Sequence, residues 1–262
     1  MTLVLTPYSP RGGTGKSHLV ANIAVVAAMS GKRVAILDTA LQSPCLDVMF
    51  NLAGGEGPTL TDYLLGSCEI LETAHDKAAS VTCDLDEIGG ALFVVPSCRD
   101  ERDAAQVLST GYDPGLLVDG CRRLIEALQL DLLLLDTPPG LSSEAVICVR
   151  LAHTIIVVER PDALHAPRKP YSPSSMAQGA DVRVVVNMVP ELMSEEEVLR
   201  RTRSAYDFAP DAILRYTPEL AALDAGGVFV CEHPDSPLSA RLRELTDRLV
   251  PTPLPVRDAR VP

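Results

Sequence analysis

The stretch SPRGGTGKSH, residues 9–18, follows a short apolar run at residues 3–5 and contains three closely spaced glycines. Gly12, Gly13 and Gly15 allow a tight turn whose backbone N–H groups point inward, where they can surround a phosphate. A helical pattern begins directly after the loop and ends at residue 31, a glycine. The sequence therefore predicts a strand, a phosphate-binding loop and a helix in succession.

Lys16 and Ser17 complete this loop. A lysine at this place reaches the β- and γ-phosphates of a nucleotide, and the hydroxyl that follows can bind Mg²⁺. The helix dipole also faces the anion. Pro10 departs from the strict eight-residue pattern, which begins with glycine, so a chance glycine turn at the start of a helix is the alternative.

Continuous apolar runs extend the pattern outward from the loop. Strands are expected at residues 2–5, 33–38, 91–96, 131–136, 153–159 and 182–187. Because these runs are apolar on both faces, they favour buried parallel strands. Further helices are expected at residues 60–65, 116–128, 142–151, 195–206, 218–224 and 238–249. The alternation predicts an α/β fold, a doubly wound and mostly parallel sheet flanked by helices.

The expected domain covers residues 1–250, and a proline-rich irregular tail covers residues 251–262. Pro167, Pro170 and Pro173 predict a short helix or an irregular loop within residues 160–179. The leucines of the last helix recur at helical spacing, and we expect this stripe to pack in the core rather than to anchor the chain in a membrane.

Composition excludes some classes of function. The chain has 262 residues and a net charge of −12, which disfavours non-specific binding to DNA or to an anionic membrane surface. Its seven cysteines form no CxxC pair, which disfavours a metal site or a disulfide framework and favours a reducing cytoplasm. No apolar run approaches the roughly 20 residues of a membrane span.

Polar residues end three of the expected strands. Asp136 ends a run of leucines and lies where open α/β sheets bind ligands, so it can hold Mg²⁺ through a water, or instead cap the next helix. Asp38 ends the second expected strand and is either part of the site or a turn residue. Asn187 can pair with adenine through one donor and one acceptor, or it can simply form a turn.

Several stretches resemble the MinD/ParA ATPases. RGGTGKSHLVANIAVVAAMSGKRVAILD, residues 11–38, resembles their deviant Walker A region. LLLLDTPPGLSSEA resembles their Walker B and switch II segment, and VVVNMV their adenine-reading strand end. RYTPELAALDAGGVFVCEHPDSPLSARLRELTDRL resembles the C-terminal part of MinD-like chains.

The resemblance implies a single P-loop domain that binds ATP and Mg²⁺ and forms a homodimer with the nucleotide between the subunits. It also implies an unidentified protein partner. Nucleotide binding is then expected from Gly12, Gly13, Thr14, Gly15, Lys16, Ser17, His18 and Asn187. The expected metal ligands are Ser17 and Asp136, and catalysis is expected from Lys16, Arg11, Asp38 and Asp136.

Arg11 stands where the family has a lysine that reaches the partner subunit's nucleotide. Its guanidinium offers five donors in a fixed fork, so it can make that contact, or it can fold back onto a local carboxylate. A second departure is Ala40, in the place of an acid that positions the attacking water. We therefore expect intact nucleotide binding with weak hydrolysis. Asp47 lies further along the loop, but its spacing does not require it to substitute.

Three functions fit these observations. One is a nucleotide-dependent dimerising switch that positions or recruits another protein, with residues 137–143 as the moving part. Another is a scaffold that binds ATP without hydrolysing it. The third is a metal-insertion or iron–sulfur carrier ATPase, which the absence of paired cysteines disfavours. A small-molecule kinase lacks any substrate-pocket signature.

Overall fold

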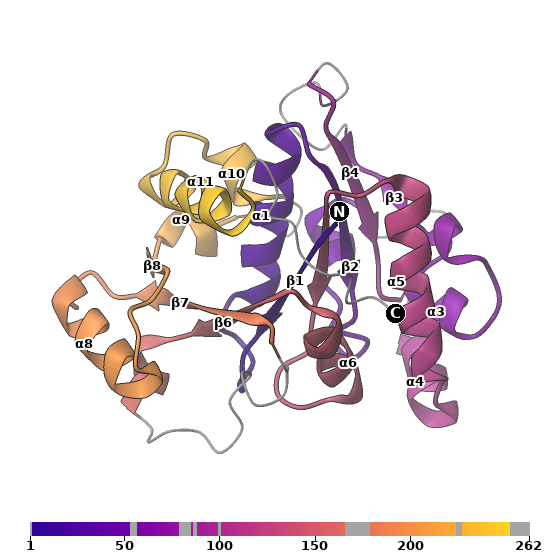
Figure 1. The fold of residues 1–262 in the computed structure, drawn as a ribbon, viewed down its shortest axis with the longest axis horizontal. Coiled ribbons are helices and arrows are strands. Elements are labelled where there is room, and N and C mark those ends of the chain that lie inside the picture. The colour runs from indigo at the N-terminus through magenta and orange to yellow at the C-terminus, as the bar shows by residue number, and fades with distance from the viewer. Residues whose placement is uncertain are drawn as a thin grey trace.

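The computed structural model describes residues 2–52, 57–78, 85, 88–98, 101–165, 179–223 and 227–251. Its eight strands form one sheet in the order β3-β4-β2-β5-β1-β6-β7-β8 (Figure 1). Every neighbouring pair is parallel except β3 with β4. The strands are β1 Leu3–Tyr8, β2 Arg33–Asp38, β3 His75–Asp76, β4 Ala91–Val95, β5 Leu132–Asp136, β6 Thr154–Glu159, β7 Asp181–Val189 and β8 Ala212–Arg215. The predicted α/β fold with a mostly parallel sheet is confirmed.

Helices cover both faces of the sheet (Figure 1). One face carries α1 Lys16–Met29, α2 Leu46–Met49, α10 Phe229–Glu232 and α11 Pro237–Leu249, with α9 Pro218–Ala221 beside them. The other face carries α3 Leu60–Leu64, α4 Glu101–Thr110, α5 Pro114–Leu128, α6 Ser143–Leu151 and α8 Glu195–Tyr206, together with the 3-10 helices η1 Ile70–Thr73 and η3 Pro161–His165. No helix in the described ranges is long and apolar enough to cross a membrane.

Side chains along each central strand alternate between the two cores. In β5, Leu132 and Leu134 pack with α1, whereas Leu133 and Leu135 pack with α3 and α5. All four are fully buried, as the continuous apolar run predicted.

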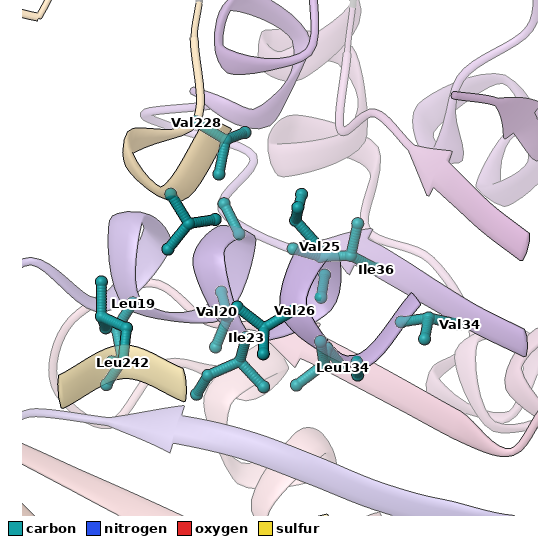
Figure 2. Packing of buried hydrophobic residues seen from close by; sticks show 14 of the residues in the cluster. Leu19, Val20, Ile23, Val25, Val26, Val34, Ile36, Leu134, Val228 and Leu242 are labelled. Atoms are coloured by element: carbon teal, nitrogen blue, oxygen red, sulfur yellow. The ribbon is translucent and has the colours of Figure 1, made fainter. Parts of the chain in front are cut away.

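Helix α1 is the centre of the larger core. Its side chains fill the space between Ile36 and Leu134 of the sheet and Leu242 of α11 (Figure 2). Eleven of its fourteen residues are buried; the other three are Ser17, His18 and Met29. The leucine stripe of α11 is buried against this core, so the expectation of core packing is confirmed.

The strand order also locates the point at which the direction of the chain connections reverses. After β1 the chain passes to β2 on one side, and after β5 it crosses β1 to reach β6 on the other. In open α/β sheets, ligands bind at the carboxyl ends of the strands where the direction reverses. That point lies beyond β1 and β5, which lead into the glycine loop and into Asp136.

Some predicted boundaries are wrong. The first strand continues to Tyr8 rather than ending at residue 5, because residues 6–8 pair with β6 and Pro7 is tolerated near the strand end. The helix expected at residues 218–224 ends at Ala221. Between β6 and β7 only the short η3 is described, and residues 166–178 and the tail from residue 252 lie outside the described residues.

Candidate functional site

The first turn of α1 opens directly from the glycine loop. Gly15 is the N-cap residue in a left-handed conformation, φ 85°, and no side chain caps the helix. The first turn also contains no acidic residue. Because the first N–H groups of a helix have no partner within the helix, this end attracts an anion. No side chain caps these N–H groups, so they are available to bind a ligand.

Lys16 lies inside this loop with only 7% of its surface exposed. Its Nζ donates to Ser9 Oγ at 3.2 Å, and Ser9 Oγ donates to the carbonyl oxygen of Arg11 at 2.6 Å. Burial lowers the pKa of Lys16, and the nearby charge of Asp136 opposes this shift. The ammonium is therefore largely removed from water, and the opposite charge of Asp136 offsets part of the cost of its burial.

Asp136 is fully buried at the end of β5. Burial raises the pKa of its carboxyl, while Ser17 and Lys16 nearby lower it. The Ser17 hydroxyl and the Thr137 N–H are close enough to lower this pKa, but neither makes a hydrogen bond of normal geometry, so both carboxylate oxygens lack such a partner among the described residues. Buried polar oxygens without partners are costly, so this pair of acceptors is suited to a cation.

Asp38 has a different environment. Its carboxylate accepts hydrogen bonds from the N–H groups of Ala40 at 2.8 Å, Cys45 at 3.2 Å and Leu46 at 3.3 Å. Burial and the charge of Asp136 raise the pKa of Asp38 despite these three donors. Asp38 thus holds the loop after β2 and the start of α2, and its expected part in catalysis stays a prediction.

The loop after β5 is joined to the glycine loop. Thr137 Oγ1 donates to the carbonyl oxygen of Pro7 at 2.6 Å, and the Gly140 N–H donates to that of Ser9 at 2.9 Å. Leu141, next in the chain, is 47% exposed. The segment expected to move therefore forms one hydrogen bond to the end of β1 and one to the phosphate loop.

Asn187 reaches the site from β7. Its Nδ2 donates to the carbonyl oxygen of Thr14 at 2.9 Å, and its Oδ1 accepts from the Met188 N–H at 2.9 Å. One N–H and one lone pair of the amide remain. The structure brings Asn187 to the glycine loop, and its expected reading of adenine stays a prediction.

The remaining predicted residues lie around the same loop. Arg11, Gly12 and Gly13 are exposed, and Arg11 forms no ion pair with any described residue. His18 has a buried Nδ1 without a partner in the described part of the chain, and burial lowers its pKa. Thr14 Oγ1 is likewise buried and unpaired among the described residues.

Sequence reasoning missed two contributors. Ser9 accepts from Lys16, and Cys45 lies beside Ser17, whose hydroxyl lowers the thiol pKa against the larger effect of burial, which raises it to about 12. Neither residue has a motif spacing that could have identified it, because both contacts depend on the tertiary fold.

The residues present fit a magnesium nucleotide. Unpaired oxygens of Asp136, the Ser17 hydroxyl and the buried Lys16 lie together at the uncapped start of α1. These are the donors and acceptors that a triphosphate and a hard cation require.

A model of the CobQ/CobB/MinD/ParA nucleotide-binding domain matches residues 6–226. The chain belongs to this family. The match begins within β1 and includes the glycine loop, Asp136 and Asn187. The expected MinD/ParA resemblance is therefore confirmed, and the chain is a member of the MinD/ParA family of P-loop ATPases.

Two curated relatives of this CobQ/CobB/MinD/ParA member are 25% identical to it. One is an uncharacterised ATP-binding protein of Methanocaldococcus jannaschii, with 95% of this chain and 88% of the relative covered. The other is an iron–sulfur cluster carrier protein of Saccharolobus solfataricus, with 92% and 81% covered. Among solved structures, the septum site-determining protein MinD of Pyrococcus horikoshii in complex with Mg-ADP has a TM-score of 0.72 at 19% identity, covering 95% and 96% of the two chains.

Proposed function

We propose that this chain binds ATP with Mg²⁺ at the glycine loop and acts as a nucleotide-dependent dimerising switch for a partner protein. The observation that carries the proposal is the pair of unpaired, buried carboxylate oxygens of Asp136 beside Lys16 and Ser17. Without a bound cation, only the charge of Lys16 and the nearby Ser17 and Thr137 offset the burial of this acid.

Each residue has a distinct part in binding. The N–H groups of the loop and of the first turn of α1 surround the phosphates, and Lys16 reaches the β- and γ-phosphates. Ser17 and Asp136 hold the Mg²⁺, directly or through water. When bound, Mg²⁺ neutralises charge on the phosphate oxygens.

Pairing of two ATP-bound subunits is supported by Arg11. Its side chain is exposed beside Gly12 and Gly13, and it has no ion pair with a described carboxylate. The local alternative, in which Arg11 folds back onto a neighbouring acid, would require such an ion pair, and none is present among the described residues. A free guanidinium at the mouth of a phosphate site can bind an anion held by a second subunit.

Hydrolysis in this proposal is slow. Ala40 is buried, and only its backbone N–H contacts Asp38, so residue 40 offers no group to orient a water. Asp47 lies in α2, and its buried Oδ1 has no partner among the described residues; no hydrogen bond between described residues joins it to the phosphate loop.

Titration calorimetry with Mg-ATP on the wild type and on Asp136→Ala tests the binding step. We expect binding by the wild type that depends on Mg²⁺ and is lost in the variant. No retention of ATP or ADP by the wild type, with Mg²⁺ present, would overturn the proposal. Phosphate release at dimerising protein concentrations separates the switch from the scaffold, since a scaffold turns over no faster than Asp136→Ala.

An iron–sulfur carrier is the second candidate, because one curated relative bears that name. No disulfide joins the six cysteines in the described ranges, and no cluster of three or more metal-ligating side chains occurs there. Iron binding by the dimer after anaerobic reconstitution, read by absorbance, would favour this candidate over the switch.

A further inference from the structure

Strand β7 contains an irregularity at the point where it reaches the phosphate loop. Its pairing with β8 shifts register between Val186 and Val189, as in a β-bulge. Within the bulge Met188 has φ 55°, a left-handed conformation that is unfavourable for a residue with a side chain. Bulges re-aim side chains, and strained backbone recurs at functional sites.

The side chain that this bulge directs is Asn187, which is 7% exposed. Its Nδ2 binds the Thr14 carbonyl, and its Oδ1 is fixed by the Met188 N–H. A Cβ on Gly15 would lie 2.5 Å from Asn187 Nδ2 and 3.5 Å from Met188 Cε. The bulge and the phosphate loop are therefore in direct contact, with no room for a side chain at position 15.

The bond to Thr14 has a consequence for the next peptide group. In a trans peptide, the C=O of one residue and the N–H of the next point in opposite directions. When Asn187 holds the Thr14 carbonyl on its side, the Gly15 N–H must point to the other. The orientation of one loop donor is thus set by an amide on another strand.

We propose that Asn187 is a positioning residue for the phosphate loop, which prepares the loop for any nucleoside triphosphate regardless of its base. This inference rests on the proposed function, because it assumes that the loop binds a nucleotide. It differs from base reading, in which the same amide would discriminate adenine and leave the phosphates unaffected.

The test compares ATP with inosine triphosphate, which keeps the ribose and the triphosphate but lacks the amino group of adenine. We expect Asn187→Ala to weaken binding of both by about tenfold, the usual value of one buried hydrogen bond, and to leave the ratio of the two Kd values unchanged. Loss of ATP affinity alone, so that the ratio moves toward one, would overturn the proposal in favour of base reading. Unchanged affinity for both would overturn it as well.

A matched control is Asn22→Ala in α1. Asn22 is also buried, donates to the His18 carbonyl at 2.7 Å and accepts from the Val230 N–H at 2.9 Å. We expect this variant to lower the Tm while both Kd values stay within about twofold, since it does not touch Thr14. An equal loss of affinity in Asn22→Ala would reduce the Asn187 effect to general destabilisation and contradict the proposal.

If Asn187→Ala does not fold, Asn187→Asp gives the same comparison. It is isosteric and keeps the acceptor for Met188, but it cannot donate to Thr14. The ratio of the two Kd values is again the readout, because an added charge near the phosphates affects both nucleotides equally. A wild type that binds neither nucleotide would overturn the proposed function itself, whereas normal wild-type binding with unaffected variants overturns only this inference.

Discussion

Asp38 and Asp136 are register partners on the neighbouring parallel strands β2 and β5, and both are fully buried. Three backbone N–H groups bind the carboxylate of Asp38, whereas that of Asp136 has no partner among the described residues. The two adjacent acids therefore differ in environment: the carboxylate of Asp38 holds a loop, and that of Asp136 is the acceptor that the proposed function assigns to Mg²⁺.

This pair makes stability without nucleotide depend on pH. Burial raises the pKa of Asp38 to about 7 and that of Asp136 to about 6, above the value of 3.8 for an ordinary aspartate. The folded state then binds more protons than the unfolded state between about pH 4 and pH 7, so stability falls as the pH rises through this window. We expect Asp136→Asn to weaken this fall and to raise the free energy of unfolding at pH 8 by about 1–3 kcal/mol.

Chemical denaturation at pH 5.5 and pH 8 measures this effect, with Asp235→Asn, an exposed acid, as the control. The same Asp136→Asn variant should lose the stabilisation that Mg-ATP gives the wild type. Equal pH slopes for the wild type and the variant would contradict the assignment of a buried, unpaired carboxylate.

Lys16→Ala should abolish nucleotide binding, with Kd rising by about a hundredfold or more, because the variant removes the only buried ammonium of the described site. Fluorescence titration with a labelled ATP measures it. Lys32→Ala is the control and should bind nucleotide as the wild type does. Lys32 directly precedes β2, at the end of the strands opposite to the glycine loop. Retained binding in Lys16→Ala would mean that the nucleotide lies elsewhere.

Arg11→Ala should weaken ATP-dependent dimerisation by at least about tenfold and leave nucleotide binding by the monomer within about twofold. Mass photometry or analytical ultracentrifugation with a non-hydrolysable ATP analogue reports the oligomeric state. Arg241→Ala, which removes an exposed ion pair with Glu244 on α11, provides the comparison. A dimer of undiminished affinity in Arg11→Ala would exclude the contact across subunits.

Ala40→Asp should raise the rate of phosphate release by about tenfold or more, because it restores an acid that can orient water. The buried position beside Asp38 should lower the Tm of the same variant. Ala40→Asn has nearly the same shape and no charge, so it should share the loss of stability without the gain in turnover. Equal rates for the wild type and Ala40→Asp would remove residue 40 as the cause of slow hydrolysis.

The sequence predicts most of the sheet because strands buried on both faces must be apolar at every position. Short runs such as DLLLLD favour a strand over a helix because of their length and the polar residues that flank them. β8 is missed because it is only four residues long and half-buried, and α4 because ERDAAQVLST has few apolar residues. Their existence depends on neighbours, β7 for the strand and α3 for the helix.

The candidate site divides in the same way. The glycine loop and Asp136 follow from motif spacing and strand ends, and the fold places Lys16 near Asp136. The bond from Lys16 to Ser9, the three N–H groups on Asp38 and the bond from Asn187 to Thr14 join residues whose meeting depends on the tertiary fold or on loop geometry. Local sequence patterns cannot predict such contacts.

Because α1 is packed on all sides, the element that carries Lys16 cannot shift without opening the main core. A bound ligand therefore contacts a rigid helix terminus. We expect any conformational response to ligand binding to occur in the loops around the site rather than in α1. These are the loop that begins at Thr39 and the loop that begins at Thr137, each held by only a few hydrogen bonds. The rigid packing of α1 thus limits the nucleotide-dependent surface to these two loops. We expect a partner protein that distinguishes nucleotide states to bind there.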